Sequence, residues 1–96
     1  MNTEIPNVIW MPTGKEPSVY AGSPTQIVSE MAEEMSEELS ERLTIREAVD
    51  NLTFGLAAGR GVIIGLPPDL PEEDLARLFV RSLLDTGVAQ PVLAAA

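Results

Sequence analysis

Two helix-start signatures in the middle of the chain constrain its fold more than any other feature. Ser23 is followed by Pro24 and then by Gln26, and the same spacing recurs where Thr44 is followed by Glu47. In such a capping box, the first side chain accepts a hydrogen bond from the third helical N–H. The glutamine or glutamate side chain accepts one from the N–H of the capping residue. Each signature therefore predicts the first turn of a helix.

Apolar residues continue both helices at helical spacing. After Pro24 they recur at Val28, Met31, Ala32, Met35, Leu39 and Leu43, and after Thr44 at Ile45, Ala48, Val49, Leu52 and Leu56. A stripe with steps of three and four residues is typical of an amphipathic helix. The pattern predicts one helix from Pro24 to between Glu37 and Arg42, and a second to about Ala58.

A third helix is expected near the C-terminus. Asp69 and Glu72 have capping-box spacing, Pro71 falls in the first turn, and a broad apolar face follows. We expect this helix to begin after Asp69. Gly87 is suited to the left-handed conformation that ends a helix.

The chain begins with a predicted β-hairpin. "NVIWM" lies between Pro6 and Pro12, "SVYAG" follows a turn that contains Gly14, and both segments favour strands. Because proline removes a hydrogen-bond donor from a sheet, the flanking prolines predict a strand near the sheet edge.

The stretch "FGLAAGRGVIIGLPP", from Phe54 to Pro68, resembles a phosphate loop only in its glycine content. Phosphate loops run from a strand into a helix, because the anion binds the free N–H groups of the helix N-terminus. Here a helix ends at the glycines, so we interpret Gly59 or Gly61 as the left-handed residue that ends it. The unbroken apolar run Val62–Ile64 then predicts an interior strand.

The predicted fold is α+β: a small sheet of three to four strands, with the hairpin first, and about three helices packed on it. The predicted order is ββααβα, with a final strand in "VAQPVL" as an option. At 96 residues, the chain is expected to form a single domain over 1–96, with frayed ends at 1–5 and 93–96.

The net charge of the chain limits the classes of molecule that it is expected to bind. Fifteen acidic residues against six basic ones give a formal net charge of −9, which disfavours direct binding to nucleic acid or anionic lipid. No apolar run is long enough to span a bilayer, and the N-terminus lacks the positive charge of a signal peptide, so we expect a cytoplasmic protein. Five arginines against one lysine suggest a bacterial source.

The chain has neither histidine nor cysteine. The commonest general base, the commonest metal ligand and the best nucleophile are therefore missing. Paired carboxylates remain, but they act in clefts that a domain of this size has little room to form. We predict no enzyme activity, no catalytic residues, no cofactor and no metal site.

An acidic run is the most unusual feature of the sequence. It comprises Glu30, Glu33, Glu34, Glu37, Glu38 and Glu41. Helical spacing places these carboxylates on one face, where like charges four residues apart each cost roughly a few tenths of a kcal/mol. The face is interpreted as a solvated surface, as a docking surface for a basic partner or, least favoured, as a divalent-cation site. Trp10 is interpreted either as a core residue or as an interface anchor.

These observations favour a small, acidic, non-catalytic interaction module: a regulator, adaptor or accessory subunit that forms a homodimer and binds a protein partner. One alternative is an acidic decoy that inhibits a basic nucleic-acid-binding protein. A second is an accessory subunit of an enzyme whose active site is shared at an interface. The candidate partner-binding residues are the six glutamates and Trp10.

Overall fold

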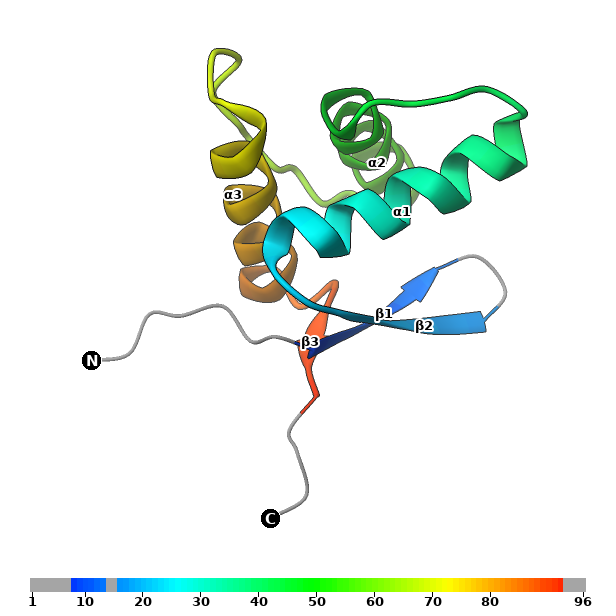
Figure 1. Ribbon diagram of the computed structural model, residues 1–96. Coiled ribbons are helices and arrows are strands. Elements are labelled where there is room, and N and C mark those ends of the chain that lie inside the picture. The colour runs from blue at the N-terminus through cyan, green and yellow to red at the C-terminus, as the bar shows by residue number, and fades with distance from the viewer. Residues whose placement is uncertain (1–7, 14–15, 93–96) are drawn as a thin grey trace.

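The computed structural model describes residues 8–13 and 16–92 (Figure 1). Its elements are β1 (Val8–Thr13), β2 (Glu16–Ala21), α1 (Pro24–Leu39), α2 (Ile45–Arg60), α3 (Glu72–Asp85) and β3 (Gln90–Pro91). Three antiparallel strands form one sheet, and the three helices lie on the same side of it. The α+β class, the leading hairpin and the three helices are confirmed. The termini expected to fray, 1–5 and 93–96, lie outside the described residues.

The sheet has the order β2-β1-β3. β1 pairs with β2 along its whole length, from Val8 opposite Ala21 to Thr13 opposite Glu16. On its other side, β1 pairs with β3 only at Ile9 and Trp10. The first strand is therefore central, and the prediction of an edge strand was wrong. Pro12 is tolerated because it lies beyond the two residues of β1 that have a partner on both sides.

The capping boxes predicted at Ser23 and at Thr44 are confirmed. The Ser23 N–H donates to Gln26 Oε1 over 2.8 Å, and the Gln26 N–H donates to Ser23 Oγ over 3.2 Å. At the start of α2, the Thr44 N–H donates to Glu47 Oε1 over 2.9 Å, and the Glu47 N–H donates to Thr44 Oγ1 over 3.1 Å. These local bonds satisfy backbone donors that a helix start leaves unpaired.

The third helix begins later than expected. Its N-cap is Pro71, which makes no side-chain capping bond, and the helix starts at Glu72. The predicted cap at Asp69 was wrong. That cap would have required a helical conformation at Leu70, and the residue before a proline is driven away from it. Gly87, with φ 80°, follows the helix in the left-handed conformation, as predicted.

The chain between α2 and α3 does not form the predicted strand. Gly61, with φ 68°, ends α2 as expected, but residues 62–64 have no partner strand among the described residues. Ile64 is 7% exposed and packs in the core, whereas Ile63 is 77% exposed. The apolar run therefore supplies one anchor to the core, and the third strand of the sheet is β3.

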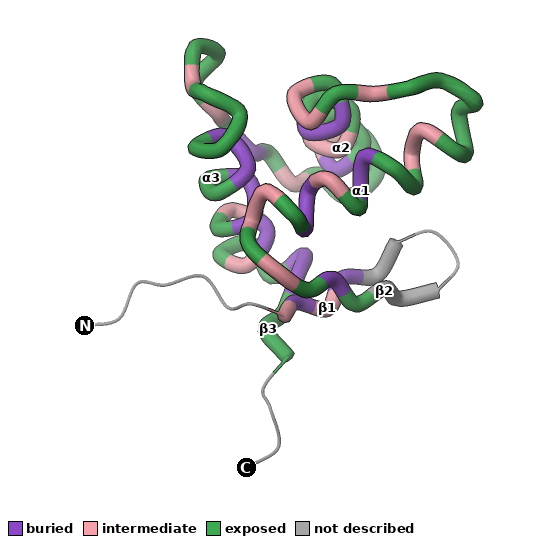
Figure 2. The backbone as a smooth tube through the Cα atoms, viewed as in Figure 1, coloured by how far each residue is buried: buried purple, intermediate pink, exposed green. Residues whose placement is uncertain are grey.

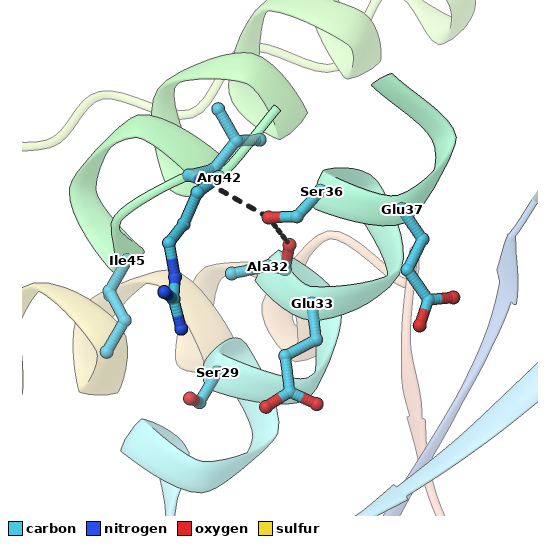
Figure 3. A pocket seen from close by; sticks show the side chains of 8 residues that line it. Ser29, Ala32, Glu33, Ser36, Glu37, Arg42 and Ile45 are labelled. Carbon is cyan, nitrogen blue, oxygen red and sulfur yellow. Dashed lines mark hydrogen bonds between the residues drawn. The ribbon is translucent and has the colours of Figure 1, made fainter. Parts of the chain in front are cut away.

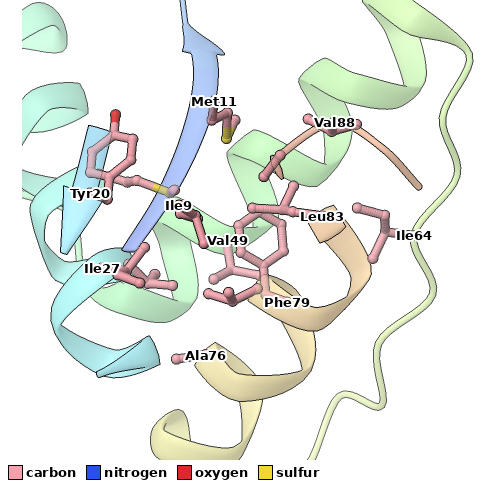
Figure 4. Packing of buried hydrophobic residues seen from close by; sticks show 14 of the residues in the cluster. Ile9, Met11, Tyr20, Ile27, Val49, Ile64, Ala76, Phe79, Leu83 and Val88 are labelled. Atoms are coloured by element: carbon pink, nitrogen blue, oxygen red, sulfur yellow. The ribbon is translucent and has the colours of Figure 1, made fainter. Parts of the chain in front are cut away.

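The core lies between the inner face of the sheet and the helices (Figure 2). Ile9 from β1, Val49 from α2, and Phe79 and Leu83 from α3 converge there, each fully buried (Figure 4). Burial of one such side chain contributes about 1.5–3 kcal/mol. No charged side chain is buried in the part of the chain that the structure describes.

Candidate protein-interaction surfaces

The side of the sheet that faces away from the helices forms a surface that we call the outer sheet face. Strand alternation separates it from the core, because successive side chains point to opposite sides of a sheet. Ile9, Met11 and Tyr20 point inward and are at most 3% exposed. The outer sheet face consists of Val8, Trp10, Val19, Ala21, Gln90 and Val92.

Cross-strand pairing arranges these six side chains in two adjacent rows. Trp10 lies in the central strand with Val19 on one side and Gln90 on the other. Val8 lies opposite Ala21. The Val92 N–H donates to the Val8 carbonyl oxygen over 3.0 Å, which continues the register of β3. Side chains opposite one another on adjacent strands are in direct reach, so the residues form one continuous surface.

The composition of the outer sheet face is unusual for a solvated surface. An antiparallel sheet with one face in water normally alternates apolar residues inward with polar residues outward. Among the outward positions whose side chains the structure describes, five of six carry apolar side chains. Val19 is 59% and Val92 42% exposed, whereas Val8 and Trp10 are partly covered. In the described part of the chain, no helix packs on this side (Figure 1).

The structure places Trp10 outside the hydrophobic core cluster, in the middle of the outer sheet face. Of the two sequence interpretations, this position fits an interface anchor better than a core residue. Tryptophan is enriched among the residues that dominate binding energies, and these cluster near interface centres. Binding through Trp10 stays a prediction.

The six glutamates of the acidic run form what we call the acidic surface, which lies on and just after α1, on the helical side of the sheet. All six glutamates are exposed, but α1 ends at Leu39, and Glu41 follows the left-handed Ser40. The prediction of six carboxylates on one helix face was therefore wrong for Glu41. After Ala32, α1 has no buried residue, and Leu39 is 54% exposed, so the second half of the helix extends beyond the core.

Glu34 has a structural contact in addition to its place on this surface. The hydroxyl of Tyr20 donates to Glu34 Oε2 over 3.2 Å. Two of the other glutamates, Glu33 and Glu37, line an open groove between α1 and the start of α2 (Figure 3). The structure therefore distributes the predicted acidic residues over different environments.

The groove has a volume of about 410 Å³. Its lining consists of Ser29, Ala32, Glu33, Ser36, Glu37, Arg42, Leu43 and Ile45. Arg42 brings a guanidinium to a surface that is otherwise acidic (Figure 3). Ser36 Oγ donates to the Ala32 carbonyl oxygen over 2.7 Å and accepts from the Leu43 N–H over 3.0 Å. This hydroxyl therefore holds the α1–α2 connection in place and is already engaged in two bonds.

The carboxylates do not converge as metal ligands do. Among residues 8–13 and 16–92, no three acidic side chains are grouped closely enough to hold a metal ion. None of the described helices has the length and apolar character needed to cross a membrane.

Comparison with protein-family models, with curated proteins and with solved structures finds no match. Function is therefore inferred from the surfaces of this chain. Sequence reasoning identified Trp10 but missed Val8, Val19, Ala21 and Val92. The signal for Val8 was the apolar run around Trp10, in which residues of both faces of β1 are apolar, whereas Val19, Ala21 and Val92 join this face only through strand pairing and the register that continues from β3.

Proposed function

We propose that this protein is a small, non-catalytic interaction module that binds another protein surface through its outer sheet face. The supporting observation is the apolar outer sheet face centred on Trp10, on the side of the sheet that no described helix covers. Apolar surface in water is unfavourable by about 25 cal/mol per Å². Binding of a partner that covers the outer sheet face would remove this apolar surface from water, which favours the complex.

The residue inventory agrees with a binding role. The groove that combines Glu33 and Glu37 with Arg42 is lined by no histidine or cysteine, and its Ser36 hydroxyl is bonded to backbone groups. The outer sheet face, in contrast, has the composition of an interface centre: a tryptophan with four aliphatic side chains and one glutamine, all without charge. Regulator, adaptor and accessory subunit are all compatible with such a surface.

The test compares wild-type protein with two variants that introduce the same charge at sites of similar exposure. Val19→Lys places an ammonium on the outer sheet face, and Leu39→Lys places one on α1, where the wild-type side chains are 59% and 54% exposed. Each tagged protein is used for affinity capture from an extract of the source cells, followed by mass spectrometry. Partners that bind through the outer sheet face are retained by wild type and Leu39→Lys and lost with Val19→Lys. Equal capture by all three proteins contradicts the proposal.

The acidic surface supports a second candidate, the decoy that occupies a basic nucleic-acid-binding site. Six exposed glutamates within residues 30–41 provide a high density of negative charge. A simultaneous change of Glu30, Glu34, Glu37 and Glu41 to glutamine is expected to abolish capture of a basic partner and the salt dependence of binding. Capture with unchanged salt dependence rules the decoy out.

A further inference from the structure

None of the six described side chains of the outer sheet face is charged, although the chain has a formal net charge of −9. Thirteen of the fifteen acidic residues lie between Glu30 and Asp85, a part of the chain that is mostly helical and contains no strand. The helices lie on the other side of the sheet (Figure 1). The molecule therefore separates an uncharged apolar face from a strongly acidic one.

We propose that the outer sheet face binds the same face of a second copy of this chain, so that two sheets pack face to face in a symmetric dimer. The inference rests on the proposed function, because it names the occupant of the same surface. It also favours association through the sheets over association through the helices, because all three helices carry acidic residues that would repel those of a second copy.

Charge favours this occupant and this orientation. Packed sheets lie about 10 Å apart, and each helical layer adds roughly another 10 Å, so the acidic surfaces of the two copies would lie on opposite outer sides of the dimer. That separation exceeds the Debye length of about 8 Å at physiological ionic strength, and the repulsion is largely screened. A dimer formed through the helices would instead bring glutamates within the screening length. A basic partner is attracted to the acidic surface, whereas the uncharged, apolar outer sheet face is complementary to the same face of a second copy.

The arrangement of side chains suits a symmetric interface. In a two-fold dimer, the same patch contacts itself, so large side chains need small ones beside them. Trp10 lies in the central strand, and the adjacent row contains Val8 and Ala21, which leave room beside the indole. Trp10 of each copy would therefore lie near the centre of the interface, against the small side chains of the other copy.

The first test is the mass of the purified full-length chain, measured by light scattering after size exclusion. We expect twice the monomer mass of 10.3 kDa for wild type and for Leu39→Lys. Val19→Lys is expected to elute at 10.3 kDa, because it would bring two ammonium groups into an apolar contact. The two variants change the net charge equally, and thermal melts followed by circular dichroism verify that both fold. If Val19→Lys does not fold, Val92→Lys replaces it, since Val92 is 42% exposed on the same face.

Trp10 provides a second readout because it is the only tryptophan in the chain. Dilution of wild type should shift its fluorescence emission to longer wavelength as the mass falls, and Val19→Lys should show the shifted emission at every concentration. A wild-type mass of 10.3 kDa at high concentration overturns the dimer. So does a Val19→Lys variant that remains dimeric, or a Leu39→Lys variant that becomes monomeric as well.

The same variants separate this inference from the proposed function. A monomeric wild type whose cellular partners are lost with Val19→Lys contradicts the dimer and leaves the interaction module standing. If Val19→Lys dissociates the dimer without loss of any other captured protein, the dimer is supported, and the second copy is the partner that the outer sheet face binds.

Discussion

The buried Tyr20 donates its phenol hydroxyl to the carboxylate of the exposed Glu34, with 3.2 Å between the two oxygens. Tyr20 lies on the inner face of β2, and Glu34 lies on α1. The bond therefore connects the hydrophobic core to the acidic surface. It also holds the midpoint of α1 over the edge strand of the sheet.

Glu34 is expected to contribute more to stability than its neighbours in the acidic surface. Glu34→Ala should lower the free energy of unfolding by about 1 kcal/mol, because it removes an acceptor for a hydroxyl that is shielded from water. Glu33→Ala removes the same charge from the adjacent position, and its effect should stay within about 0.5 kcal/mol. Urea denaturation of both variants measures the difference. Equal effects would mean that the Tyr20 bond does not stabilise the fold.

Ser40→Gly is expected to stabilise the protein. Ser40 has φ 54° and ψ 36°, and it is the only described residue other than glycine with a positive φ. The left-handed conformation costs a residue with a Cβ about 1–2 kcal/mol, and part of the gain is offset by the greater freedom of glycine in the unfolded chain. The free energy of unfolding, measured by urea denaturation, should rise by about 0.5–1 kcal/mol. Gly61 has φ 68°, and a Cβ added there would meet only open space. Gly61→Ala should therefore lower the free energy of unfolding, because alanine is strained in this conformation. A destabilising Ser40→Gly contradicts this prediction.

The capping box of α2 is expected to make stability depend on pH. The pKa of Glu47 lies below its usual value of 4.5. The larger cause is the hydrogen bond with the backbone of Thr44, and the smaller one is the hydrogen bond with the Thr44 side chain. Because the pKa is lower in the folded state, this stabilisation is present above the unfolded pKa and is lost as pH falls through the folded pKa. Glu47→Gln keeps an acceptor at this position but cannot titrate. The stability difference between wild type and Glu47→Gln, measured by denaturation from about pH 7 to about pH 2, should therefore shrink as the solution becomes acidic. A constant difference would show that the folded state does not perturb this carboxyl.

Arg46 is expected to hold the connection between α2 and α3. Its Nη1 donates to the carbonyl oxygen of Pro68 over 3.1 Å, and its Nη2 donates to that of Leu70. Arg46→Met should lower the free energy of unfolding by about 1–2 kcal/mol, because two carbonyl groups lose a charged donor. Amide hydrogen exchange should accelerate in residues 61–70. Arg60→Met, at an exposed position at the end of α2, serves as the control and should leave both measurements nearly unchanged.

Local chemistry determined much of this fold. The two capping boxes, the end of α2 at Gly61 and the hairpin at the start of the chain could all be predicted, because each depends on residues close in sequence. A capping side chain reaches a backbone group three residues away, and a left-handed glycine ends its own helix. Even the error at Asp69 had a local cause, the proline two residues later.

The tertiary structure decided what local patterns leave open. The apolar run Val62–Ile64 has the character of a strand, but the place beside β1 is taken by the short β3, and residues 62–64 pair with no described strand. In the same way, the alternating direction of side chains along a strand places Ile9 and Trp10 on opposite faces of β1. It does not indicate which of these faces the helices cover. The helices pack on the Ile9 side, which leaves Trp10 on the outer sheet face. Sequence by itself determined where most elements begin and end, because those signals act over a few residues. Only packing between distant segments decided which apolar surface became the core and which remained for a partner.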